Sequence, residues 1–236
     1  MKALLFDCDG VLADTERDGH RPAFNLAFSQ AGLGITWDVP TYGELLRIGG
    51  GKERLRHYFD TRGWPVPEVA RDDLVARLHR LKTDLFLRII EGGQLPARPG
   101  VARIVDEAAS IGLTLAVCST SNERAVHAVV THLLGPQRRR AFAGLFAGDI
   151  VPRKKPAPDI YLHAARLLGV APSQCLVVED SANGLQAARA AGMRCLVTTS
   201  AYTAAEDFTG AARIVPDLGE PPGPHLTLDD LRVLAV

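Results

Sequence analysis

The sequence lacks a net charge. Among its 236 residues, lysine plus arginine and aspartate plus glutamate both number 27, so the formal net charge is +0. Because no overall basic field exists, we expect neither nucleic acid nor an anionic membrane as a partner. The short run Arg138-Arg139-Arg140 is typical of a solvated loop. Any site for an anion must therefore be local.

Long hydrophobic runs and paired cysteines are also missing. No apolar stretch approaches the roughly 18 residues that cross a bilayer, and Asp7 and Asp9 interrupt the short apolar start. Without a CxxC spacing, the few cysteines indicate neither a metal centre nor a redox pair, and we expect buried, reduced thiols. They are Cys8, Cys118, Cys175 and Cys195. We predict a cytoplasmic monomer without a signal peptide.

What the sequence does contain is a regular alternation of elements. Hydrophobic residues make up 47% and charged residues 23%, which is typical of a soluble globular protein. Short apolar runs alternate with segments of helical spacing, and this alternation predicts an α/β fold with a Rossmann-like parallel sheet covered by helices. The runs are KALLFD, LTLAVCS, CLVVED and RCLVTT.

Helix start and stop signals follow these runs. A helix is expected from about Arg98 to Ile111. Thr120 and Glu123 are spaced as a capping box for the next helix. A further helix is expected to start near Ser181 and to end at Gly192.

Residues 15–91 break the alternation with a long, mostly helical insertion. We predict that this insertion is a separate helical domain, while residues 1–14 and 92–236 form the core. The glycine- and proline-rich segment EGGQLPARPG is the expected hinge back into the core.

Carboxylates gather at the predicted strand ends. The ends at Asp7, Ser119 and Asp180 should face one crevice, where ligands of open parallel sheets bind. Asp7-x-Asp9 alone could be an acidic turn. With Glu179 and Asp180 beside it, however, the group would be costly to bury unless a cation lay among them. Mg²⁺ is the cofactor that this donor set favours.

Two adjacent lysines precede a proline-framed turn, Lys154-Lys155-Pro156-Ala157-Pro158. For Lys154 the pattern favours a solvated basic turn. For Lys155 it favours a positioned cation that neutralises a phosphate, with Ser119 and nearby backbone amides donating hydrogen bonds to the phosphate oxygens.

The motifs DCDGV, STS, KPAPD and VVEDSANG, in this order and spacing, resemble the four motifs of the haloacid dehalogenase superfamily of phosphotransferases. The resemblance spans nearly the whole chain. It implies that the sheet domain is the catalytic core and that the insertion is a helical C1 cap.

The resemblance also implies residue roles. Asp7 would be the nucleophile that becomes an aspartyl phosphate, and Asp9 would protonate the leaving alcohol and then activate water. Asp7, the backbone carbonyl of Asp9, and Asp180 would hold Mg²⁺, with Glu179 binding it directly or orienting its waters. The residues that would hold the transferring phosphoryl group are Ser119, Thr120 and Lys155.

Within this superfamily, YGELLRIGGGKER and DTERDGHRPAFN are similar to the CbbY-type phosphatases, which act on xylulose-1,5-bisphosphate. The glycine-rich start of a helix, followed by two cations, suits a second phosphate, although a plain helix-joining loop remains possible. The predicted substrate-binding residues of the cap are Glu16, His20, Tyr42, Gly50, Gly51, Lys52 and Arg54. The alternatives left open are β-phosphoglucomutase, phosphoglycolate phosphatase and a phosphate-binding regulator without activity.

Overall fold

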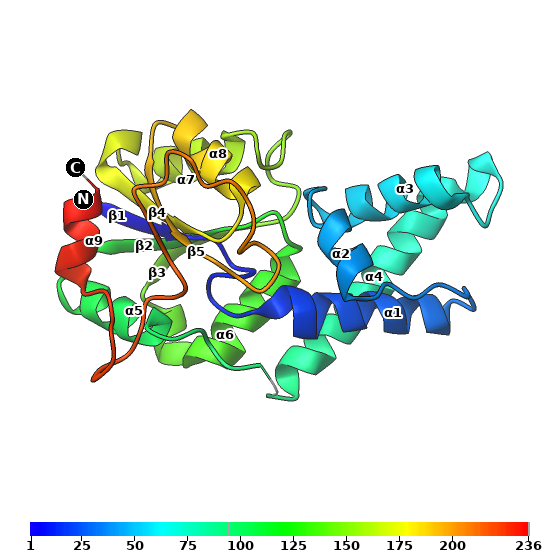
Figure 1. The fold of residues 1–236 in the computed structure, drawn as a ribbon, viewed down its shortest axis with the longest axis horizontal. Coiled ribbons are helices and arrows are strands. Elements are labelled where there is room, and N and C mark those ends of the chain that lie inside the picture. The colour runs from blue at the N-terminus through cyan, green and yellow to red at the C-terminus, as the bar shows by residue number, and fades with distance from the viewer. Residues whose placement is uncertain (94, 236) are drawn as a thin grey trace.

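Six parallel strands form the centre of the core. The protein is described by a computed structural model that covers residues 1–93 and 95–235, and its sheet has the order β3-β2-β1-β4-β5-β6 (Figure 1). Neighbouring strands are parallel throughout, which confirms the predicted α/β class. The strands are β1 (Ala3–Phe6), β2 (Thr114–Cys118), β3 (Phe142–Phe146), β4 (Cys175–Glu179), β5 (Arg194–Thr198) and β6 (Arg213–Val215).

The four apolar runs became β1, β2, β4 and β5, whereas β3 and β6 were not predicted. β3 carries a glycine at Gly144 and is largely only half-buried, and β6 has three residues, none of them fully buried. β6 is thus too short to show an apolar run, and β3, although apolar throughout, has a glycine in its interior, which weakens the sequence signal of a strand.

Helices cover both faces of the sheet because β1 is apolar on both sides. Leu4 and Phe6 pack toward one face, and Ala3 and Leu5 pack toward the other. The first face is covered by α5 (Val101–Ser110), α6 (Glu123–Arg139) and α9 (Leu228–Leu234), and the second by α7 (Asp159–Leu168) and α8 (Ala182–Ala190). Removal of this apolar surface from water is what holds the layers together.

The ends of these helices partly match the predicted signals. Ser181 caps α8 as expected, with its side chain accepting a hydrogen bond from the amide of Gly184. The predicted capping box of Thr120 and Glu123 is wrong, because Asn122 is the residue that caps α6. The predicted helix from Arg98 starts later, at Val101, because the preceding Gly100 has a left-handed φ of 80°.

The insertion forms a helical layer with a core of its own. Its aromatic and aliphatic side chains pack together, with Phe24, Trp37 and Tyr42 fully buried. In Figure 1 this layer, which we call the cap, lies beside the sheet domain. Its elements are a short π-helix (Glu16–His20), α1 (Arg21–Gln30), α2 (Val39–Leu45), α3 (Gly51–Arg62), a 3₁₀ turn (Glu68–Ala70) and α4 (Arg71–Glu91).

The remaining expectations concern the return segment, the thiols and membrane spans. The predicted hinge EGGQLPARPG includes residue 94, which lies outside the described residues. The four cysteines are buried and free, as predicted. Among the helices that the structure describes, none combines the length and the apolar character needed to cross a membrane.

Candidate active site

A cavity of about 110 Å³ lies where the carboxyl ends of β1, β2 and β4 meet the cap. The crevice predicted at Asp7, Ser119 and Asp180 is therefore present. Core residues predicted for the site that line the cavity are Asp7, Asp9, Ser119, Thr120, Lys155, Glu179 and Asp180. The predicted cap residues that line it are Glu16, His20, Gly50, Gly51 and Arg54, whereas Tyr42 and Lys52 do not.

Lys155 is the central cation of the site. Its Nζ donates hydrogen bonds to Asp7 Oδ1 at 2.7 Å, to Glu179 Oε1 at 2.6 Å and to the carbonyl of Cys118 at 2.8 Å. Burial by itself lowers the pKa of this lysine, but Asp7 and Glu179 outweigh burial and raise it above its ordinary value. Lys155 is thus held as a cation beside the Asp7 carboxylate.

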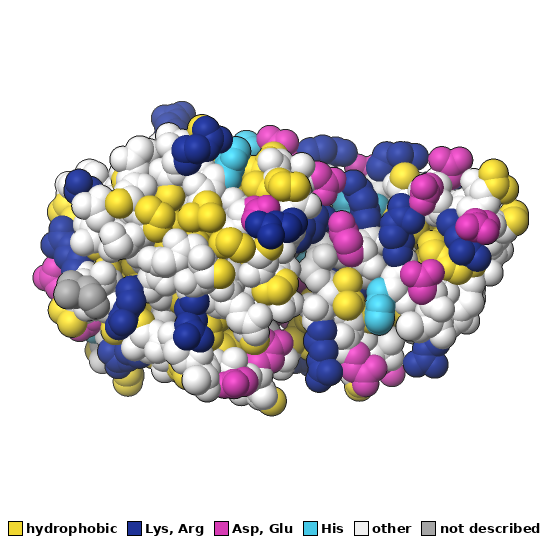
Figure 2. Space-filling view, turned by 90° about the horizontal axis from the view of Figure 1, so that it is seen from above, with side chains coloured by type: hydrophobic (Ala, Val, Ile, Leu, Met, Phe, Trp, Pro, Cys, Tyr) yellow, Lys and Arg dark blue, Asp and Glu magenta, His cyan; other side chains and the backbone are white. Residues whose placement is uncertain are grey.

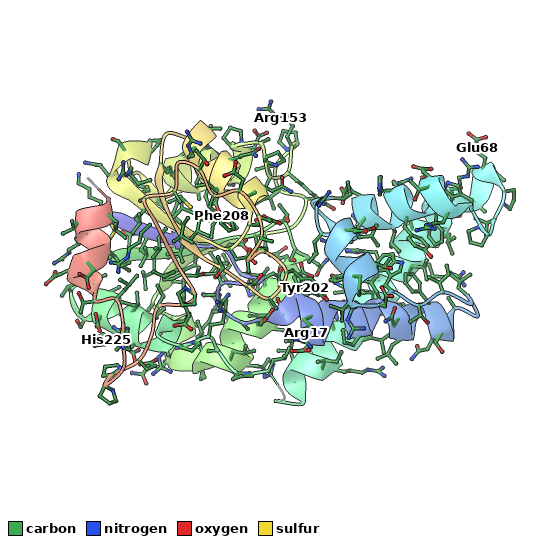
Figure 3. The ribbon with its side chains drawn as sticks, in the orientation of Figure 1. Arg17, Glu68, Arg153, Tyr202, Phe208 and His225 are labelled. Atoms are coloured by element: carbon green, nitrogen blue, oxygen red, sulfur yellow. The ribbon has the colours of Figure 1, made fainter. Side chains whose placement is uncertain are left out.

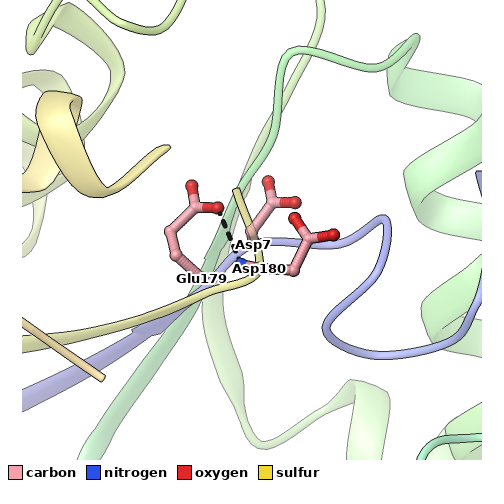
Figure 4. A group of neighbouring side chains, drawn as sticks. All are labelled: Asp7, Glu179 and Asp180. Atoms are coloured by element: carbon pink, nitrogen blue, oxygen red, sulfur yellow. Dashed lines mark hydrogen bonds between the residues drawn. The ribbon is translucent and has the colours of Figure 1, made fainter. Parts of the chain in front are cut away.

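Asp7, Glu179 and Asp180 place three carboxylates together (Figure 4). One carboxylate oxygen from each residue lies within 4.8 Å of the other two. Burial raises the pKa of Asp7 to about 8 against the charge of Lys155, and burial with the charges of Glu179 and Asp7 raises that of Asp180 well above its usual range. One lysine does not neutralise three buried carboxylates, so the group fits a divalent cation with oxygen ligands.

Two glycines make room for this carboxylate group. A Cβ on Gly10, whose φ is +78°, would lie 2.0 Å from Asp180 Oδ2. A Cβ on Gly184 would lie 1.9 Å from the carboxyl carbon of Glu179. Both distances are far below a van der Waals contact, so only glycine lets the two backbones approach the acids so closely.

Asp9 is surrounded by donors. Its Oδ1 accepts from Thr15 and lies 2.9 Å from His20 Nε2, and its Oδ2 accepts from Ser121. Burial would raise the pKa of Asp9, but His20 and the hydrogen bonds from His20, Ser121 and Thr15 lower it overall. Asp9 is therefore an ionised carboxylate whose protonation is linked to His20.

Lys82 contacts the other ring nitrogen of His20, so Asp9, His20 and Lys82 form a series of hydrogen-bonded side chains. It comes from α4, is 7% exposed, and its Nζ lies 2.7 Å from His20 Nδ1. An ammonium group only donates, so His20 Nδ1 accepts and His20 Nε2 carries the hydrogen that is donated to Asp9. Burial lowers the pKa of Lys82 to about 8, although Glu16 and Asp9 oppose this effect.

Ser119 and Thr120 directly follow β2 and line the cavity. Ser119 is 2% exposed, and its Oγ accepts a hydrogen bond from the amide of Ser121 at 3.0 Å. Its hydroxyl hydrogen is thus free to be donated to an oxygen in the cavity.

In the cap, Glu16, Tyr42 and Arg54 form one hydrogen-bonded group. The Tyr42 hydroxyl donates to Glu16 Oε2 at 2.5 Å and accepts from Arg54 Nη1 at 2.9 Å. Tyr42 was predicted to bind substrate, but it is fully buried and does not line the cavity. Its hydroxyl instead orients Glu16 and Arg54, which do line it.

Lys52 and Lys154 are placed differently from the predictions. Lys52, which was predicted to bind a second phosphate, lines a neighbouring cavity instead of the one that contains Asp7, and it donates to Asp149 Oδ2 at 2.6 Å. Lys154 is not the solvated turn residue expected from its pattern. Its side chain is 16% exposed and lies 3.0 Å from both Glu53 and Asp149.

Sequence reasoning missed several residues near the site, among them the Asp9 partners Thr15 and Ser121. Lys82 and His79 lie on one helix of the cap, and Tyr161 donates to Glu179 Oε1 at 2.5 Å from α7. His79 lines both this cavity and its neighbour. No local motif marks a polar residue on the inward face of a helix, so the sequence offered no signal for these three.

Comparisons with known proteins agree with this site. The chain belongs to the haloacid dehalogenase-like hydrolases, because the model of this family matches residues 1–192. The predicted membership and the prediction of an enzyme are thereby confirmed.

Individual relatives are similar over most of the chain. A CBBY-like protein of Arabidopsis thaliana is 58% identical over 93% of this chain and 70% of its own length. The crystal structure of CbbY from Rhodobacter sphaeroides in complex with phosphate has a TM-score of 0.88 and 40% identity, covering 98% of this chain and 99% of that one. A mutant of the same protein in complex with xylulose-(1,5)bisphosphate has a TM-score of 0.88 and 39% identity, over the same shares.

Proposed function

We propose that this protein is a Mg²⁺-dependent phosphatase that hydrolyses xylulose-1,5-bisphosphate through an aspartyl-phosphate intermediate. The observation that carries the proposal is the position of Asp7, whose carboxylate is 2.7 Å from the Lys155 ammonium in a cavity lined by residues of both the core and the cap. The similar CbbY of Rhodobacter sphaeroides, in complex with phosphate and, as a mutant, with xylulose-(1,5)bisphosphate, supports the choice of substrate.

The metal would be held by Asp7, Asp180 and the backbone carbonyl of Asp9, with Glu179 as a further ligand or as a partner of bound water. When bound, Mg²⁺ would supply positive charge beside the transferring phosphoryl oxygens and would reduce the repulsion between the carboxylates of Asp7, Glu179 and Asp180. Glu179 also accepts from Lys155, Tyr161 and the amide of Asp180, which fixes its carboxylate.

In the first step, a carboxylate oxygen of Asp7 attacks phosphorus, and the bond between phosphorus and the ester oxygen breaks. Asp9 gives its proton to the departing sugar oxygen. Asp9 is ionised beforehand, so it takes that proton from His20 Nε2, while Lys82 passes one to His20 Nδ1. The lowered pKa of Lys82, about 8, favours this transfer.

In the second step, Asp9 accepts a proton from a water molecule that attacks the same phosphorus. Asp9 passes this proton back to His20 Nε2 while His20 Nδ1 returns one to Lys82, so all three groups regain their starting protonation. The bond between phosphorus and Asp7 breaks, phosphate leaves, and the Asp7 carboxylate is restored. Throughout both steps Lys155, Ser119 and Thr120 would hold the phosphoryl oxygens, because a loose transition state mainly needs aligned oxygens and fixed positive charge.

The cap would select the substrate. Glu16 and His20 would bind sugar hydroxyl groups, and Arg54 with the amides of Gly50 and Gly51 would bind the phosphate that is not transferred. Tyr42 would keep Glu16 and Arg54 in place through its two hydrogen bonds. Lys52 would join this phosphate only after leaving Asp149.

The test is phosphate release in the presence of Mg²⁺ from a panel of esters. We expect the highest specificity constant for xylulose-1,5-bisphosphate, compared with ribulose-1,5-bisphosphate, β-glucose-1-phosphate and phosphoglycolate. A preference for phosphoglycolate would overturn the substrate assignment. Conversion of β-glucose-1-phosphate to glucose-6-phosphate without phosphate release would identify a mutase instead.

A further inference from the structure

Four charged residues link the cap to the core beside the active site. We call them the clasp: Lys52 and Glu53 in the first turn of α3, and Asp149 and Lys154 in the core segment between β3 and α7. Lys52 lies 2.6 Å from Asp149, and Lys154 lies 3.0 Å from both Glu53 and Asp149. Figure 2 shows basic and acidic side chains side by side where the core meets the cap. The clasp thus joins the two domains with balanced charge.

The clasp lies directly next to the backbone of the catalytic lysine. A Cβ on Gly49 would be 2.9 Å from the Lys155 carbonyl oxygen, and one on Gly50 would be 2.8 Å from Lys154 Nζ. The absence of side chains at these two glycines lets the cap approach the core segment this closely. Gly50 and Gly51 line the cavity at the place where the cap meets this core segment, and the ion pair of Lys154 with Glu53 spans the same interface.

We propose that Lys154 is a positioning residue that, through Glu53, holds the cap closed over the phosphoryl site. This inference rests on the proposed function, because it assigns closure a role in binding the substrate. Lys154 is suited to the role because its side chain is 16% exposed, whereas the partner carboxylates are 44% and 59% exposed. The protein holds this cation in place, while its accessible partners leave the ion pairs open to screening by salt and allow the contact to open and close.

A double-mutant cycle tests the pair. Glu53→Gln and Lys154→Met should each raise KM about 3- to 10-fold, or about 0.7 to 1.4 kcal/mol, because a smaller closed population lowers apparent affinity. The KM of the double variant should be no higher than that of the poorer single variant. In all three variants kcat should change less than about 2-fold. Lys154→Arg, which keeps the charge, should restore KM. Additive losses, or a KM unchanged in both single variants, would overturn the proposal.

The matched control is Arg153→Met. Arg153 precedes Lys154 but pairs with Asp159 inside the core, and it is 71% exposed. Figure 3 labels it at the surface. Its loss should leave KM near the wild-type value. The clasp variants should lose affinity equally for xylulose-1,5-bisphosphate and for a sugar monophosphate, whereas selective loss for the bisphosphate would indicate direct phosphate contact and contradict a purely positioning role.

A second measurement does not depend on turnover. Fluorescent labels on Glu68→Cys in the cap and Arg166→Cys on α7 would report closure by energy transfer, since the native cysteines are buried. Raising the salt concentration from about 0.05 to 0.5 M should open the wild-type cap and have much less effect on the Glu53→Gln, Lys154→Met variant. An equal salt response in both would refute the clasp, even if the proposed substrate were also wrong.

Discussion

His79 should make the folded protein sensitive to acid. It lies on α4 at the boundary of the two neighbouring cavities, and burial with the charges of Lys82, Lys52 and Lys154 lowers its pKa from 6.5 to about 3. Asp149 opposes this effect without reversing it. Between about pH 6.5 and 3 the unfolded chain therefore binds a proton at this position that the folded chain does not bind, so stability falls as the pH drops below 6.5.

The size of the effect follows from the two pKa values. At pH 5 the unfolded state gains about 2 kcal/mol from protonation of His79, and at pH 7.5 it gains almost nothing. His79→Gln removes the titrating group while keeping a polar side chain of similar size. From pH 7.5 to 5, the variant should consequently lose about 2 kcal/mol less of its free energy of unfolding than the wild type does.

The assay is urea unfolding at both pH values, followed by tryptophan fluorescence. Both tryptophans, Trp37 and Trp64, belong to the insertion that contains His79, so they report the relevant unfolding. Other acids contribute to the pH dependence of both proteins, and the comparison between them cancels that contribution. Parallel loss of stability in wild type and variant would refute a His79 that stays neutral in the folded protein.

Further predictions concern catalysis and the metal. Asp7→Asn should abolish phosphate release while circular dichroism stays unchanged, because an amide cannot form the acyl phosphate; turnover near the wild-type rate would refute the covalent mechanism. Lys82→Met should lower kcat more than tenfold with little change in KM in steady-state assays, since it ends the proton chain to Asp9. Gly184→Ala should weaken Mg²⁺ binding in isothermal titration calorimetry by displacing the Glu179 carboxylate, and an unchanged affinity would remove Glu179 from the metal site. EDTA should stop the reaction and Mg²⁺ should restore it.

The motifs of the core could be located from the sequence because each follows an apolar run. Asp7, Ser119 and Asp180 stand directly after β1, β2 and β4, and the carboxyl ends of parallel strands meet at one edge. The parallel pairing of β1 with β2 and β4 brings these three residues together, and no detail of side-chain packing is needed to predict this. This is why the cavity contains every core residue that the motifs predicted.

The cap was harder to predict. Its glycine-rich segment, Glu16 and Arg54 were found, but Tyr42 was assigned to the cavity although it lies in the cap's own core. A tyrosine on an amphipathic helix can present its hydroxyl to a ligand or to a neighbouring side chain, and helical spacing does not distinguish the two. Only the packing of α2 against the π-helix and α3 directs it to Glu16 and Arg54.

By itself, the sequence determined the fold class, the family and the chemical groups at the strand ends, because these depend on local patterns of apolar and polar residues. The tertiary structure decided which partner each lysine near the site contacts. Lys154 and Lys155 are adjacent, yet one bridges to the cap and the other reaches Asp7, and Lys82 meets His20 across 62 residues of chain. These contacts depend on how the cap closes onto the core, and since a side-chain contact is made or lost within about an ångström, no sequence spacing encodes it.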